Sequence, residues 1–181
     1  FVGVTNFHVA KLTDDAAGGT PKYDASVSIP WVRQVQIKPK NNSATLYADN
    51  MSGQRQMHEL NDLTIETATL PLEYKALLLG HKIDAGKLTV SKDDVAPYFA
   101  VMFESTKQNG KKRFVRFAKV QFTEPDETSK TKEDKIDYST PSMTATAIYR
   151  TSDGVSLEQA DEEADGYVDT TGTNWYTLTT V

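Results

Sequence analysis

The chain has 181 residues and a formal net charge of −5, with 20 lysines and arginines against 25 aspartates and glutamates and no cysteine. This length fits one domain with its own core, and the missing cysteine excludes disulfides, thiolate metal sites and a cysteine nucleophile. No apolar run approaches the roughly 20 residues that span a bilayer, so no membrane contact is expected. Basic residues are scattered along an acidic chain, which argues against tight nucleic-acid binding.

The first third of the chain carries patterns typical of β-strands. Residues 2–10 are rich in β-branched side chains and stop at a loop with Gly and Pro at 14–21. Residues 31–38 and 63–68 alternate apolar with polar side chains, which predicts two half-buried strands that can pair as a hairpin. The polar side chains that face away from the core in these strands are Gln34, Gln36, Lys38, Asp62, Thr64 and Glu66.

The connection between these two strands, residues 39–58, is much longer than a usual hairpin loop of about two to five residues. It mixes polar loop formers with the apolar residues Leu46, Tyr47, Met51 and Met57. A fully solvated loop would gain nothing from these apolar groups. The segment is therefore interpreted as a buried end or a partner surface, or as an ordinary packed Ω-loop.

A single short helix is predicted over residues 71–79. Pro71 suits a first helical turn, Glu73 favours the positive end of the helix dipole, and Gly80 offers a C-terminal stop. One apolar stripe is expected at spacing i, i+4 and i+7, made of Leu72, Ala76 and Leu79. Such a helix would pack across a sheet.

The second half of the chain contains the clearest hairpin. Residues 97–104 are almost continuously apolar, which is typical of a strand covered on both faces. The dipeptide Asn109-Gly110, a strong signal for a two-residue turn, separates them from the returning strand at 112–122. A charged excursion at 124–135 and a further strand at 143–149 follow.

The end of the chain is acidic. Residues 157–169 contain six carboxylates and no basic residue, which favours a solvated face or a mobile tail, and residues 174–181 are aromatic and prone to form a strand. We divide the chain into a β domain at 1–154 and an acidic extension at 155–181. This extension is expected to pack on the same domain or on a neighbouring subunit.

No pattern in the sequence indicates catalysis. The histidines His8, His58 and His81 lack metal-ligand spacing, and no nucleophile elbow, P-loop or dinucleotide-binding motif occurs. The adjacent carboxylates Asp14-Asp15 and Asp93-Asp94 fit solvated turns better than calcium sites. We therefore expect no catalytic residue, no metal and no cofactor, and give little weight to a hydrolase with carboxylates brought together by folding.

The order of several short segments carries a family resemblance. These segments are residues 3–10 (GVTNFHVA), 43–50 (SATLYADN), 70–73 (LPLE), 77–81 (LLLGH), 94–98 (DVAPY), 109–115 (NGKKRFV), 122–125 (FTEP) and 140–146 (TPSMTAT). Over about residues 3–154 the chain resembles the major tail proteins, or tail tube proteins, of long non-contractile phage tails. The acidic end after residue 154 has no counterpart in this resemblance.

This resemblance implies a mainly β fold, a β-sandwich or half-barrel of antiparallel strands with one short flanking α-helix. It further implies a structural virion protein, made in the host bacterial cytoplasm, that self-assembles into hexameric rings stacked as a tail tube. DNA would cross the lumen without specific binding. The implied partners are further copies of the chain, a tape measure protein, a tail terminator and a distal tail protein.

Two sets of residues follow from this implied assembly. Residues 39–58 correspond to a loop that reaches the adjacent ring, and the expected contact residues are Leu46, Tyr47, Asp49, Met51, Arg55 and Met57. Because DNA must pass without sticking, a polar and net-acidic inner face is expected. The candidates for the lumen are Gln34, Gln36, Asp62, Thr64 and Glu66, with ordinary solvent exposure as the alternative interpretation.

A β-sandwich binding module for carbohydrate or a host receptor is the alternative function. It would be favoured if four aromatic residues lined one groove, namely Tyr23, Trp31, Trp175 and Tyr176. The same residues suit a core or a subunit interface.

Overall fold

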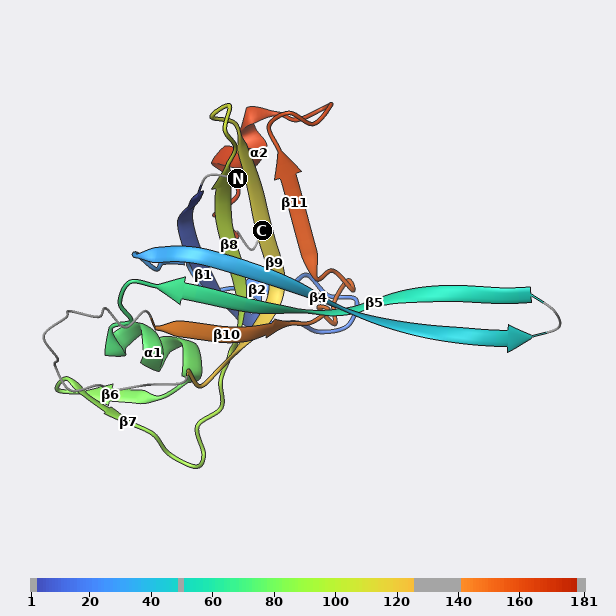
Figure 1. Cartoon of the computed structure of the whole chain (residues 1–181). Helices are drawn as coiled ribbons and strands as arrows, with labels where there is room; N and C mark the ends of the chain where they lie inside the picture. Colours follow the sequence, from blue (N-terminus) through green and yellow to red (C-terminus); the bar gives the residue numbers. More distant parts are fainter. Residues whose placement is uncertain (1–2, 49–50, 126–140, 179–181) are drawn as a thin grey trace, which may run out of the picture.

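The computed structural model describes residues 3–48, 51–125 and 141–178, with the backbone alone described between residues 41 and 60 (Figure 1). Strands dominate, which confirms the expected mainly β fold. The elements in chain order are β1 (Gly3–Asp14), β2 (Lys22–Tyr23), β3 (Val27–Ser28), β4 (Val32–Ala48), β5 (Met51–Thr67), α1 (Leu72–Leu79), β6 (Lys82–Asp84), β7 (Lys87–Thr89), β8 (Tyr98–Thr106), β9 (Lys112–Thr123), β10 (Ser142–Ala147), β11 (Leu157–Asp161) and α2 (Asp169–Thr173).

Nine of these strands form one antiparallel sheet in the order β2-β1-β8-β9-β10-β5-β4, with β3 added to β1 and β11 added to β9. The sheet branches at β9. One edge of β9 pairs with β8, while the other edge pairs with β11 along its first half and with β10 along its second half. In Figure 1, β10, β5 and β4 consequently run across β1, β8 and β9, and the two layers enclose the core.

The main core lies inside this curved sheet and receives side chains from β1, β5, β8, β9, β10 and α1. Phe99 pairs with Val120, but Val101 pairs with Phe117, so β9 contains an extra residue at this point. This bulge keeps Phe117 and Val120 on the same inner face, although they are three residues apart. Large core side chains with at most 1% exposure include Leu63, Ile65, Phe99, Val101, Phe117 and Val120.

Strand β8 is buried on both faces, as its apolar run predicts. Its alternate residues Ala100 and Met102 face a second apolar cluster, which Phe114 and Trp175 complete. The predicted hairpin of β8 with β9 is confirmed. Its turn differs from the expected two-residue type: Gly110, at φ 80°, donates its N–H to the carbonyl of Lys107, which is typical of a three-residue loop with a glycine bulge.

Residues 157–161 belong to the same sheet, and described residues further along the C-terminal segment pack against it. Strand β11 pairs with β9 from Leu157 to Asp161, and α2 follows. Residues 174–178, expected as a strand, contain none, and Trp175 is 5% exposed because it covers the outer face of β8 and β9. Residues 157–161 are therefore not a mobile tail, although β11 remains partly exposed to solvent.

Helix α1 starts after Pro71 and ends at Gly80, which has a φ of 75° and donates its N–H to Ala76. Its bounds agree with the prediction, but the expected apolar stripe is only partly right. Leu72 is 47% exposed, while Leu78 is 1% exposed and takes its place in the core. The helix meets the sheet through its last turn, so the first-turn leucine lies outside the contact.

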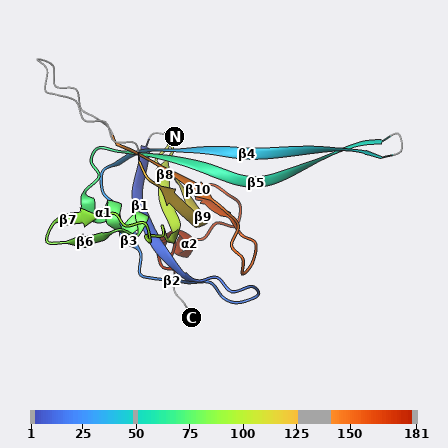
Figure 2. The same cartoon turned by 90° about the horizontal axis from the view of Figure 1, so that it is seen from below.

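After α1 comes a small hairpin of β6 and β7, which the sequence did not reveal. Its turn uses Ala85 at φ 47° and Gly86 at φ 77°, a pair of positive φ angles typical of a type I′ turn. We call residues 70–97, which contain α1, β6 and β7, the α1 lobe. Figures 1 and 2 show this lobe on the side of the molecule away from the tip of the β4–β5 hairpin.

The largest departure from expectation is the connection between β4 and β5. Residues 39–48 and 51–58 are strands and not a loop: β4 and β5 have 17 residues each and stay paired from Val32↔Thr67 to Ala48↔Met51. The pairing of β5 with β10 extends no further along the hairpin than Asn61↔Ala147. Beyond that point the two strands leave the body as a ribbon, which we call the arm (residues 41–60; Figures 1 and 2).

Candidate assembly surfaces

The arm holds the residues expected to contact a neighbouring ring. Leu46, Tyr47 and Ala48 pair with Gly53, Ser52 and Met51, so the structure brings Leu46, Tyr47 and Met51 close to the end of the arm. Arg55 and Met57 lie nearer the body, opposite Ala44 and Asn42. Asp49 falls outside the described residues.

The arm has an energetic problem that a partner would solve. A two-stranded ribbon is marginally stable in water, and both of its outer edges carry unpaired backbone groups. In the described part of the chain no third strand pairs with residues 41–60. Eight residues of β4 lie beyond Lys40, and at about 3.3 Å per residue they extend the ribbon by roughly 25 Å.

The five residues proposed for the lumen form one contiguous patch. Gln34 pairs with Glu66, and Gln36 pairs with Thr64. Asp62 is two residues further along β5, on the same face. Val35, Ile37, Leu63 and Ile65, their neighbours in sequence, all point into the core. The structure thus brings all five candidates together on one face.

Residues that the sequence analysis did not select extend this patch across two more strands. On β10, Thr144 lies opposite Thr64 and Thr146 opposite Asp62, and Thr144 also pairs with Thr123 of β9. The alternating Ser-x-Thr-x-Thr pattern of residues 142–146 was the available signal. We call the combined surface the polar face: Gln34, Gln36, Lys38, Lys40, Asp62, Thr64, Glu66, Thr123, Ser142, Thr144 and Thr146.

Charges on the polar face are balanced. Asp62 and Glu66 are accompanied by two lysines of β4, and Lys40 Nζ lies 2.9 Å from Asp62 Oδ2. Lys38 pairs with Asp62 in the register of the two strands. The net-acidic surface expected for these residues is therefore not present on this face, because cross-strand lysines offset the carboxylates.

Strand β4 ends the sheet order, so its outer edge is unpaired within the described residues. Between this strand and β1, β8 and β9 lies an open groove of about 480 Å³. Val35 and Phe103 form part of its apolar wall, and Arg33 and Arg113 supply positive charge. The curved sheet is thus a half-barrel with an open seam, and its free edge is a surface on which another strand can pair.

The four aromatic residues that would favour a binding module do not share a groove. Trp31 is 54% exposed, has a φ of 66° and lines a groove of about 360 Å³ beside β1. Trp175, Tyr23 and Tyr176 belong instead to the second apolar cluster under the C-terminal segment. Tyr23 donates its hydroxyl to the carbonyl of Ala118 at 2.8 Å, as expected for a packed residue.

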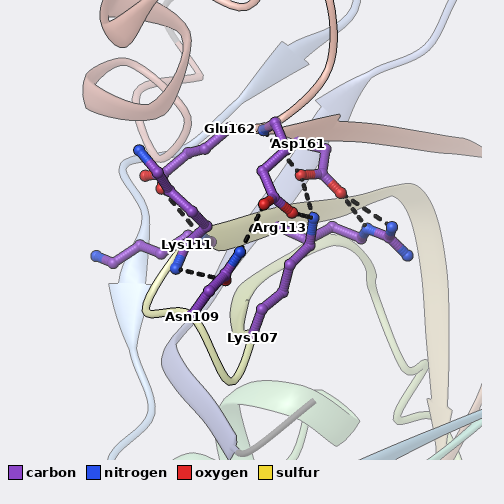
Figure 3. A network of polar contacts seen from close by, with 8 residues as sticks. Lys107, Asn109, Lys111, Arg113, Asp161 and Glu162 are labelled. Atoms are coloured by element: carbon purple, nitrogen blue, oxygen red, sulfur yellow. Dashed lines mark hydrogen bonds and ion pairs between the residues drawn. The ribbon is translucent and has the colours of Figure 1, made fainter.

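Acidic side chains of the C-terminal segment are neutralised by the β8–β9 hairpin (Figure 3). Asp161 accepts hydrogen bonds from Lys107 at 2.6 Å and from Arg113 at 2.9 Å. Glu163 pairs with Lys107 and accepts a hydrogen bond from Asn109. The ammonium of Lys107 and the other donors around the Asp161 carboxyl lower its pKa to about 2. The sequence signal was the set of basic residues in and beside that hairpin.

Glu104 is a buried carboxylate that the sequence analysis overlooked. It is 3% exposed and accepts hydrogen bonds from Asn6 at 2.8 Å and from the Tyr176 hydroxyl at 2.9 Å, and Lys112 Nζ lies 2.8 Å from its other oxygen. Burial alone would raise the pKa of Glu104, but these three donors outweigh burial and lower it. This carboxylate joins β1, β8 and β9 to the C-terminal segment.

Asp15 likewise is not a solvated turn residue. Its carboxylate is 2.6 Å from Lys119 Nζ and accepts N–H groups from Thr151 and Ser152 at 2.9 Å each. Burial opposes ionisation, but the lysine and the two backbone donors hold the pKa of Asp15 well below its usual range. The contact fastens the loop after β1 to the turn after β10, which leaves little freedom for calcium binding by Asp14 and Asp15.

Histidines and carboxylates do not form a metal centre in the described residues, where no group of three or more possible ligands converges. His8 contacts the carbonyl of Asn6 and the ring of Tyr176, and the side chain of His58 is outside the description. Among the described residues no helix is long and apolar enough to cross a membrane.

Comparison with known proteins found no matching family model and no matching curated protein.

Proposed function

We propose that this chain is a structural subunit that assembles with its own copies into stacked rings, forming a phage tail tube through which DNA reaches the host. The observation that carries the proposal is the arm. A body with two packed apolar clusters bears one long ribbon on which the described residues place no third strand. A neighbouring subunit would supply the missing cover.

The free edge of β4 supports lateral assembly. An open sheet edge risks uncontrolled pairing, and closing edges against identical copies in a ring removes that risk. Head-to-tail contacts that do not close then generate a filament of rings. In this proposal the edge of β4 serves contacts within a ring and the arm serves contacts between rings.

The polar face supports the DNA-conducting role. Hydroxyl and amide side chains cover most of it, and two lysines offset its two carboxylates. Such a surface has no cluster of cations with which to hold phosphates. It also presents no field strong enough to exclude DNA. We propose that this face lines the lumen and that DNA passes it without specific binding.

The same proposal assigns the protein to the virion, without catalytic activity or cofactor. Its partners would be copies of itself, the tape measure protein, the tail terminator and the distal tail protein. The acidic residues of β11 and the turn after it are engaged with the β8–β9 hairpin (Figure 3). Their role in the proposal is therefore to complete the subunit body.

The test is negative-stain electron microscopy of the purified full chain over a concentration series, alone and with the tail initiator and tape measure proteins. A shortened variant replaces residues 43–56 by Asn-Gly, which closes the hairpin after the pair Asn42↔Met57. We expect rings or tubes from the intact chain and at most isolated rings from the shortened variant.

Two further variants keep the arm at full length. The tip variant carries Leu46→Ser and Tyr47→Ser. The second variant is its matched control and carries Ser43→Ala and Thr45→Ala, nearer the body. Loss of tubes with the tip variant and their retention with the second variant support contact through the tip. Monomers of the intact chain in the presence of the initiator and tape measure proteins would overturn the proposal and favour a binding module.

A further inference from the structure

His81 occupies a tightly closed position directly after helix α1. The helix ends at Gly80, where a Cβ atom would lie 2.4 Å from the carbonyl oxygen of Val95. The segment between β7 and β8 therefore packs against the helix end with no room for a side chain at residue 80. The His81 side chain in this corner is 7% exposed.

Both ring nitrogens of His81 meet carboxylates. Nδ1 lies 2.8 Å from Asp94 Oδ2 and Nε2 lies 3.1 Å from Glu124 Oε2. A neutral imidazole has one N–H donor and one acceptor, whereas an ionised carboxylate only accepts. The arrangement is satisfied on both sides only when His81 carries a proton on each nitrogen. With both nitrogens occupied, the ring is not free to act as a general base.

The two carboxylates are held in place by other groups. Asp94 Oδ2 also accepts the N–H of Ser91 at 2.9 Å, and Glu124 Oε1 lies 2.7 Å from Lys75 Nζ on α1. Lys82 of β6 adds positive charge near Asp94. Without the proton on His81, the carboxylate of Asp94 would lose its charged partner in a nearly closed site, because its side chain is 9% exposed.

We propose that protonated His81 is a pH-sensitive clamp that holds the α1 lobe onto the end of β9. Its two ion pairs join three segments: the end of α1, the segment between β7 and β8, and Glu124 just after β9. Lys75–Glu124 is a second tie that does not depend on the histidine. Deprotonation therefore loosens the lobe locally and leaves the apolar contacts of Leu78 and Leu79 in place.

The direction of the pH dependence follows from the charges. The hydrogen bond to Asp94, the hydrogen bond to Glu124 and both negative charges raise the pKa of His81 above its ordinary value, and the pKa values of both carboxyls are lowered. The clamp is engaged between those lowered values and the raised pKa of His81. The stability that the clamp contributes is fully present below the pKa of histidine in the unfolded chain. It is lost as the pH rises through the raised pKa of His81 in the folded chain.

The first experiment follows the C2 proton of the His81 ring by NMR during a pH titration of the unaltered chain. His81 is expected to titrate above the ordinary value of about 6.5, and Asp94→Asn is expected to lower its midpoint. Asp62→Asn, which removes a carboxylate far from the lobe, is the control and should leave the midpoint unchanged. A midpoint at or below the ordinary value in the unaltered chain would overturn the proposal.

The second experiment measures hydrogen exchange of the backbone amides of the α1 lobe. At each pH, protection is the exchange rate of an unstructured peptide divided by the measured rate. We expect protection of α1, β6 and β7 to fall about tenfold as His81 deprotonates, the size typical of losing a charge-assisted hydrogen bond. His81→Gln should show low protection at every pH, whereas His8→Gln should behave as the unaltered chain. Protection independent of pH in the unaltered chain would refute the clamp, whether or not the chain forms tubes.

Discussion

The arm and the C-terminal segment differ in what surrounds them. In the described residues, the arm is a ribbon with no third strand beside it, whereas the acidic segment after residue 154 supplies a strand, Trp175 and several ion pairs to the body. The sequence favoured solvent for the acidic stretch at 157–169, and it also allowed residues 155–181 to pack on the same domain. Polarity alone does not identify a region that awaits a partner, because complementary charges elsewhere in the chain can cover it.

The largest expected effect tests how firmly the C-terminal segment belongs to the body. Trp175→Ala removes a side chain that packs on Phe114 and donates its indole N–H to the carbonyl of Val115. We expect the free energy of unfolding to fall by about 3–4 kcal/mol, measured by urea denaturation. Trp31→Ala, at an exposed tryptophan, is the matched control and should cost less than about 1 kcal/mol. Equal losses would contradict the assignment of Trp175 to the core.

Glu104→Ala is expected to have the next largest effect. It leaves the amide of Asn6 and the hydroxyl of Tyr176 without their acceptor, so unfolding should become easier by about 2 kcal/mol. Glu104→Gln retains one acceptor oxygen and should recover part of this loss. Glu158→Ala removes a more exposed ion pair with Arg116 and serves as the control. It should lower the free energy of unfolding by only about 0.5 kcal/mol. The junction at Glu104 is disproved if the two alanine variants are equally stable.

Acid should weaken the junctions at Glu104 and Asp15. The folded-state pKa values of Glu104 and Asp15 lie below the ordinary values of 4.5 and 3.8. Each carboxyl group therefore contributes stability that is fully present above its ordinary, unfolded-state pKa. This stability is lost as the pH falls through the lowered pKa of the folded state. The free energy of unfolding should decrease when it is measured from about pH 7 down to about pH 3, and this decrease should be smaller in Asp15→Asn. An equally large decrease in this variant would show that Asp15 does not contribute to the pH dependence.

The smallest effect is expected from the arm itself. Replacing residues 43–56 by Asn-Gly removes ribbon that no described strand pairs with, so the free energy of unfolding of the monomer should change by less than about 1 kcal/mol. Urea denaturation under conditions without assembly measures this value. A loss as large as that from Trp175→Ala would mean that the body depends on the arm, and the contrast between the two regions would disappear.

Several elements were predictable because local chemistry specifies them. Pro71 and Gly80 bound α1 through the missing N–H of proline and the left-handed conformation of glycine. The continuous apolar run of β8 and the Asn109-Gly110 turn placed the central hairpin. The alternation of β4 and β5 placed all five polar candidates on one face before the register was known.

Other elements had no local signal. Asn41, Asn42 and Ser43 are poor strand formers, and they extend β4 because each has a partner across the ribbon on β5. The packing of Trp175 depends on Phe114 and Val115 of β9, and Val115 lies 60 residues away in the chain. The buried Glu104 closes an apolar run and gives no sign in the sequence of the donors that reach it from β1 and residue 176.

The amino-acid sequence by itself determined the mainly β character, the position of α1, the central hairpin and the two-sided pattern of β4 and β5, because propensity, periodicity and turn chemistry act over a few residues. The tertiary structure decided which edge of β9 receives β10 and β11, which carboxylates are neutralised, and how far β4 and β5 extend beyond the body. These outcomes depend on pairing between distant segments, whose register and charge partners are set only when the chain is folded.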